Sequence, residues 1–172
     1  MRDYTYFAAD FDHDKPALEC IEYMKSIGFL QYKDAHQLQQ SSDTSLPCSI
    51  KKSLKFRMDN SCVFVLIVGN QTDTVTKGGC QLCNSYNSYL QRCARGYSID
   101  YRSYIKYECE IAAKAARDGM RIVVLYNNAV VDKKLCPEAV RYIGLHQAMW
   151  YQDSFGKYCW DYHGIARAVK GL

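Results

Sequence analysis

The sequence lacks long apolar segments, and it lacks the glycine-rich motifs that commonly hold phosphate groups. No stretch approaches the about 18 consecutive apolar residues of a membrane-spanning helix, so we expect no membrane contact. Neither GxGxxG nor GxxxxGKS/T occurs, so a bound nucleotide must be held in another way. The sequence that starts with residues 1–4 has no apolar segment of the kind found in secretion signals, which predicts a cytoplasmic protein.

Strong charge is also missing. Lys and Arg number 22 against 18 Asp and Glu, giving a net charge of +4 that is too weak and scattered to predict nucleic-acid binding. Hydrophobic residues make up 48% and charged residues 23% of the 172 residues, which indicates a globular chain. A single domain of this length, spanning 1–172, buries roughly 70% of its unfolded surface and can form a real core.

Cysteine, in contrast, is abundant, although the odd count of nine argues against a complete set of disulfides. Cys80 and Cys83 have the C-x2-C spacing of a zinc knuckle, and Cys93 follows in the same polar segment. We predict a structural zinc ion on these three residues, with a fourth ligand from Cys109 or from elsewhere in the fold. The alternative is that they are reduced thiols. The other cysteines are expected to be small buried apolar residues: Cys20, Cys48, Cys62, Cys136 and Cys159.

Apolar patterns predict an alternation of strands and helices. Strands are expected at 4–9, 29–32, 62–68 and 121–126, with a weak fifth within 142–150. Helices are expected from Asp14, as its capping residue, to Gly28, and at 46–58, 101–116 and 161–169. The continuous apolar run at 62–68 is typical of a strand buried on both faces. The predicted fold is therefore an α/β three-layer sandwich with a central parallel sheet, and segment 70–100 is an insertion.

Glu108 is the strongest candidate for chemistry. It lies in the predicted helix that precedes the buried strand at 121–126. In a doubly wound sheet this placement brings a carboxylate near the carboxyl edge, where such sheets bind ligands. The alternative is an ordinary helix carboxylate that pairs with a cation or with solvent.

The order and spacing of several segments resemble the Toll/interleukin-1 receptor (TIR) family. The resemblance is greatest to the bacterial TIR-like proteins typified by the ThsB proteins of the Thoeris anti-phage system. The segments that resemble the family are 6–10, 34–36, 49–58, 63–69 and 104–108. In the last of these, Tyr104 stands where the family's Trp-x-x-x-Glu signature has tryptophan, and Glu108 matches its glutamate. The insertion at 70–100 is longer than in the eukaryotic pattern.

The resemblance implies a TIR or flavodoxin-like fold and an enzyme that cleaves NAD between nicotinamide and ribose. It implies a catalytic role for Glu108. By the same analogy Asp10, Phe11 and Asp12 line the NAD cleft, and Asp34 and His36 follow the second strand. Tyr104 lies one helical turn before the catalytic residue and either shapes the pocket or packs.

The resemblance also implies self-association and a separate effector that senses the nucleotide product. The product would be ADP-ribose or a cyclic isomer, used as a second messenger in anti-phage defence. Two other functions stay open. One is a non-enzymatic interaction module with the same fold, since fold alone does not grant activity. The other is an enzyme resembling nucleoside deoxyribosyltransferases, which also place a glutamate near ribose.

Overall fold

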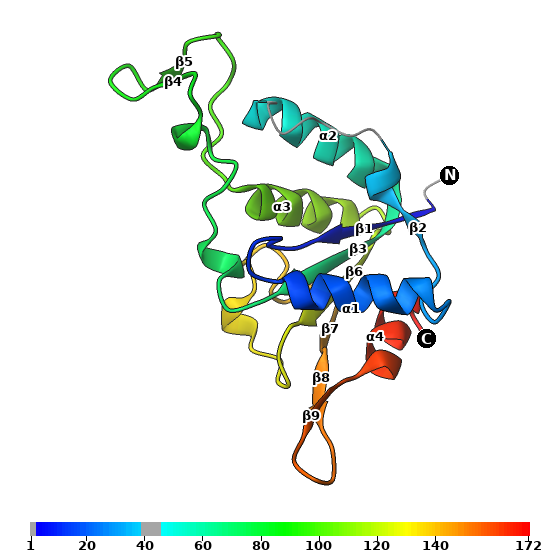
Figure 1. The fold of residues 1–172 in the computed structure, drawn as a ribbon. Coiled ribbons are helices and arrows are strands. Elements are labelled where there is room, and N and C mark those ends of the chain that lie inside the picture. The colour runs from blue at the N-terminus through cyan, green and yellow to red at the C-terminus, as the bar shows by residue number, and fades with distance from the viewer. Residues whose placement is uncertain (1–2, 39–45) are drawn as a thin grey trace.

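A five-stranded parallel sheet forms the centre of the computed structural model, which describes residues 3–38 and 46–172 (Figure 1). Its strands follow the order β2-β1-β3-β6-β7. They are β1 (Tyr4–Ala8), β2 (Lys33–Asp34), β3 (Ser61–Val68), β6 (Arg121–Tyr126) and β7 (Leu145–Ala148). The α-helices of the described residues are α1 (Lys15–Ser26), α2 (Pro47–Asp59), α3 (Tyr104–Ala116) and α4 (Tyr162–Lys170).

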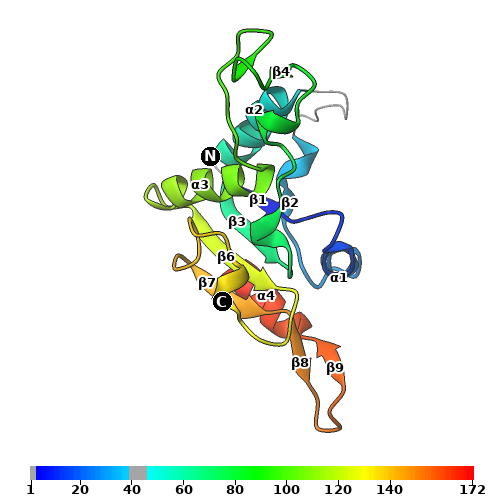
Figure 2. The same cartoon turned by 90° about the vertical axis from the view of Figure 1, so that its left-hand side faces the viewer.

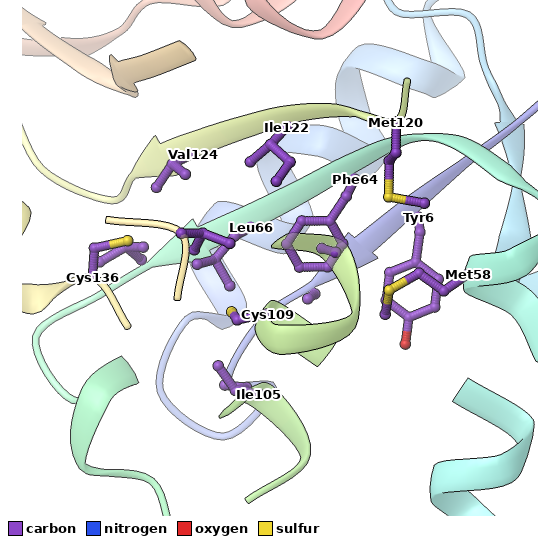
Figure 3. Packing of buried hydrophobic residues seen from close by; sticks show 14 of the residues in the cluster. Tyr6, Met58, Phe64, Leu66, Ile105, Cys109, Met120, Ile122, Val124 and Cys136 are labelled. Atoms are coloured by element: carbon purple, nitrogen blue, oxygen red, sulfur yellow. The ribbon is translucent and has the colours of Figure 1, made fainter. Parts of the chain in front are cut away.

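The inner strands bury both faces, because successive side chains of a strand point to opposite sides. In β1, Tyr6 and Ala8 join the core beneath α2 and α3, whereas Phe7, and Ala9 directly after the strand, join the core beneath α1 and α4. The same alternation runs through β3 and β6. Figures 1 and 2 show the two helix pairs on opposite faces of the sheet, and Figure 3 shows the first core at close range. The predicted three-layer α/β sandwich is confirmed.

The strand order matches the flavodoxin-like arrangement. Counted along the chain within this sheet, the strands lie in the order 2-1-3-4-5, and every neighbouring pair is parallel. β2 lies on one side of β1, and β3, β6 and β7 lie on the other side. The topological switch point is therefore between the carboxyl ends of β1 and β3. Open α/β sheets bind ligands outside the strand ends at such a point.

The second strand lies later in the sequence than expected. The prediction of a strand at 29–32 is wrong, because the amides of Phe29 and Leu30 both bond to the Met24 carbonyl and close the end of α1. Gly28 makes this turn possible with φ of 74°. Leu30 then packs fully buried in the α1 core, and pairing with β1 begins only at Lys33.

Two hairpins project from the sandwich. The insertion holds the short hairpin of β4 (Tyr86–Asn87) and β5 (Arg92–Cys93), which extends past the helices in Figure 1. A second hairpin, β8 (Trp150–Gln152) with β9 (Tyr158–Trp160), was not predicted from the sequence. Within the described residues no helix combines the length and apolar character needed to cross a membrane.

Candidate functional site

The carboxyl group of Glu108 lies inside the protein, on the face of α3 that meets the sheet. The side chain is 6% exposed, and the Tyr6 hydroxyl of β1 donates a hydrogen bond to its Oε1. Burial raises the pKa of Glu108 to about 7, although the Tyr6 hydrogen bond and the positive charge of Arg57 oppose the rise. The carboxyl group therefore changes its protonation state near neutral pH, as catalytic carboxyls do.

Ring contacts and one polar contact connect this carboxyl group, through Tyr6, to three other residues that the sequence predicted. The ring centroids of His36 and Tyr6 are 5.3 Å apart. The ring centroids of Phe11 and His36 are 6.4 Å apart, and these two rings meet edge to face. Nδ1 of His36 is 3.1 Å from a carboxylate oxygen of Asp34. Tyr6, Phe11, Asp34, His36 and Glu108 thus form one group, here called the Glu108 cluster.

Asp34 fixes the position of His36 in the Glu108 cluster. Burial alone would raise the pKa of Asp34, but hydrogen bonds from the side chain and amide of His36 outweigh it. Together with the charges of His36 and Lys25 they hold the pKa at about 2. Asp34 is therefore ionised at neutral pH and orients the His36 ring toward Tyr6.

Two members of this region were missed by sequence reasoning. Tyr6 was assigned only to a strand, yet it is the direct partner of Glu108. Arg57 of α2 is 8% exposed and donates from Nε to the Leu38 carbonyl at 3.2 Å. The alternation within β1 could have placed Tyr6 in a helix-facing layer, but nothing in the sequence says which helix meets it.

The side chains of Asp10 and Asp12 make their polar contacts apart from the Glu108 cluster. Asp10 is buried and accepts hydrogen bonds within its own loop, from the Asp12 amide at 3.1 Å and with Nδ1 of His13 at 2.6 Å. Asp12 is exposed and pairs with Lys77 at 3.3 Å. Both residues shape the loop after β1, and Phe11 between them is 61% exposed.

Tyr104 packs against the insertion. A Cβ atom added to Gly78 would lie 2.5 Å from the Tyr104 ring, so the absence of a side chain at Gly78 makes this contact possible. Burial raises the pKa of Tyr104, and the nearby thiols of Cys83, Cys48 and Cys80 add to the effect. Of the two roles left open for Tyr104, these contacts favour packing.

Asp14 lies at the switch point between β1 and β3, against Gly69 directly after β3. Its Oδ1 accepts a hydrogen bond from Asn127 at 3.2 Å, and its Oδ2 is buried without a partner among the described residues. Burial raises its pKa. Asp14 precedes α1 as predicted, but its side chain makes no capping hydrogen bond, because it points toward Gly69 at the end of β3.

Two open hollows lie beside α3. One encloses about 390 Å³ and an adjoining one about 500 Å³, and both are lined by Glu110 and Ala139. Charges of both signs surround the first: Asp73, Lys106, Glu110, Glu138 and Arg141. Glu108 lines neither hollow, so the two glutamates of α3 lie in different surroundings.

The predicted zinc ligands approach one another. Cys80, Cys83 and Cys93 line a single small hollow, which Cys48 of α2 also lines. Cys109 does not supply the fourth ligand, because it is fully buried in the core beneath α3. Among the residues that the structure describes, no three His, Cys, Asp or Glu side chains are already arranged as a metal site.

No protein-family model and no curated protein matches this chain. The roles of the residues above are therefore argued from their own geometry and chemistry.

Proposed function

We propose that the chain is a TIR-like enzyme that cleaves NAD between nicotinamide and ribose. The observation that carries this proposal is the buried carboxyl group of Glu108, with a pKa near neutrality, next to the hydroxyl and aromatic groups of Tyr6, His36 and Phe11. In the cytoplasm the product would act as a second messenger in anti-phage defence, read by a separate effector.

One carboxylate is sufficient for this reaction. The nicotinamide ring of NAD is already cationic and leaves as a neutral molecule, so no general acid is required, unlike in ordinary glycoside hydrolysis. The ribose passes through an oxocarbenium-like state with positive charge next to the broken bond. An ionised Glu108 would stabilise that charge, and it would do so strongly because it lies out of contact with water. Attack by water gives ADP-ribose, and attack from within the molecule gives a cyclic isomer.

The neighbouring groups have roles that fit this chemistry. The Tyr6 hydroxyl donates to Glu108 and so favours its ionised form. Phe11, which is largely exposed, offers a flat face on which a nicotinamide or adenine ring can stack. Glu108 is only 6% exposed, so the ribose reaches it only after the contact between Glu108 and Tyr6 opens.

One observation favours a non-enzymatic interaction module instead. The Glu108 carboxyl group already has a hydrogen-bond partner and packs beneath the helices, as a structural buried carboxyl would. In that case Glu108 contributes to the stability of the core, and the chain acts through its surface. The two functions differ in a single measurable property, the consumption of NAD.

The test is to incubate the wild-type chain, Glu108→Gln and Glu110→Gln with NAD and to identify the products by mass. The reactions are run with and without extract from phage-challenged bacteria, and a parallel set contains free nucleosides. We expect NAD loss in the wild type and Glu110→Gln and none in Glu108→Gln, because Glu110 lies outside the Glu108 cluster and pairs with Arg102.

The rate should rise as the pH passes about 7, since the ionised carboxylate is the active form. Equal loss of activity in both variants would refute the role of Glu108. No NAD consumption under any condition would support the interaction module, and turnover of nucleosides alone would support a deoxyribosyltransferase-like enzyme.

A further inference from the structure

The insertion has no packed core of its own. No residue from 80 to 100 is buried, and Tyr89 near its tip is 93% exposed. Its hairpin pairs only Tyr86 with Cys93 and Asn87 with Arg92. Two-stranded hairpins of this kind are marginally stable in water, so an additional constraint is needed to hold the segment in one conformation.

Four cysteines surround a small hollow at the base of this hairpin. Cys80 and Cys83 come from the 3-10 turn Cys80–Leu82 and the residue after it, Cys93 from β5, and Cys48 from the first turn of α2. The hollow encloses about 10 Å³, which is about the space of one water-sized sphere. Three segments of the chain therefore contribute cysteines to the lining of one hollow.

Backbone amides already donate to two of these sulfur atoms. The Asp100 amide lies 3.2 Å from Sγ of Cys80, and the Ser85 amide lies 3.4 Å from Sγ of Cys83. A backbone N–H that points at a sulfur atom helps to fix the position of that atom. Hydrogen bonds of this type also orient the ligands of metal ions.

A second anchor joins the insertion to the same helix. Lys51 lies three residues after Cys48 and hence on the same face of α2. Its side chain is 5% exposed, and its ammonium group donates to the Arg102 carbonyl at 2.6 Å and the Asp100 carbonyl at 3.4 Å. The end of the insertion is thus fixed to α2, close to the hollow, and both views in Figures 1 and 2 show the insertion rising beside this helix.

We propose that Cys48, Cys80, Cys83 and Cys93 bind one zinc ion as four thiolates, and that this ion fastens the insertion to α2. Four thiols release four protons when they bind Zn²⁺, which leaves a complex of net charge −2. The ion draws the four sulfur atoms inward to about 2.3 Å from the metal, in a tetrahedral arrangement. Sulfur ligands select zinc over the hard cations Mg²⁺ and Ca²⁺, which prefer oxygen.

The test uses the full chain, purified without chelators, and measures zinc per chain by elemental mass spectrometry. Cys48→Ser and Cys80→Ser are compared with Cys159→Ser, a half-buried cysteine of β9 that does not line the hollow. We expect one zinc ion per chain in the wild type and in Cys159→Ser, and at least a tenfold loss of zinc affinity in the other two variants.

Two further measurements keep the test decisive if a variant fails to fold. In the wild type, cobalt replaces zinc, and the intensity of the thiolate-to-cobalt absorption reports four sulfur ligands rather than three. Chelation of the wild type should also speed trypsin cleavage at Arg92 and Arg95, two exposed residues of the insertion, while the sandwich resists cleavage.

Three results would overturn the proposal. They are a wild-type chain without zinc, a Cys48→Ser variant that keeps a full equivalent with wild-type affinity, and a disulfide between any two of the four cysteines. None of these outcomes depends on whether the chain cleaves NAD.

Discussion

The buried carboxyl group of Glu108 should make the stability of the protein depend on pH in a defined direction. Raising the pKa of Glu108 from its ordinary 4.5 to about 7 in the folded state amounts to about 3 kcal/mol, because each pH unit corresponds to about 1.4 kcal/mol. The folded chain holds this proton more tightly than the unfolded chain. The resulting stabilisation is complete below pH 4.5 and is lost as the pH rises through about 7.

Glu108→Gln removes the titrating group and keeps a side chain of similar size that still accepts from the Tyr6 hydroxyl. The wild type should therefore lose stability relative to this variant between pH 5 and pH 8, by an amount on the order of 2–3 kcal/mol. Urea unfolding followed by circular dichroism at several pH values in this interval measures the difference. Subtracting the variant from the wild type cancels the titration of the other carboxyl groups.

Glu110→Gln is the matched control, since this residue is on the same helix but pairs with Arg102 near the surface. Its difference from the wild type should stay within about 1 kcal/mol and change little over the same interval. A flat difference between the wild type and Glu108→Gln from pH 5 to pH 8 would contradict the reasoning. A wild type that gains stability relative to that variant as the pH rises would contradict it as well.

Three other substitutions test the structure. Tyr6→Phe removes a hydrogen bond that lowers the pKa of Glu108, so that pKa should rise further, as measured by carbon NMR of labelled glutamate; an unchanged or lower value would speak against the contact. Gly69→Ala places a Cβ atom 2.0 Å from Oδ1 of Asp14 and should destabilise the fold by about 1–3 kcal/mol in urea unfolding. Lys51→Met leaves carbonyl groups at the base of the insertion without their donor and should cost about 1–3 kcal/mol. Limited proteolysis should then show faster cleavage of the insertion, whereas a wild-type rate would count against this anchor.

Patterns of local hydrophobicity were enough to predict the sandwich. The run at 62–68 lies in β3, and the helix predicted at 46–58 corresponds to α2. The strand at 29–32 failed because Leu30 is apolar for a different reason, namely that it closes α1 against the core. An apolar residue is buried in both cases, and the sequence does not state which element buries it.

The candidate site was predictable only one residue at a time. Glu108 could be placed on a helix, but its hydrogen-bond partner Tyr6 lies 102 residues earlier in the chain. Cys48 likewise belongs to a helix with no cysteine motif of its own, and only the packing of the insertion against α2 brings it to Cys80. Contacts between distant segments have no local signal.

The outermost strands of the sheet are brief. β2 spans two residues and β7 spans four, so the two margins expose few unpaired amide and carbonyl groups. A strand of a neighbouring polypeptide could form few backbone hydrogen bonds with these edges, which protects the chain from edge-to-edge aggregation. If copies of this protein assemble, their contacts must therefore come from side chains on helices and hairpins, not from extension of the sheet from one molecule into the next.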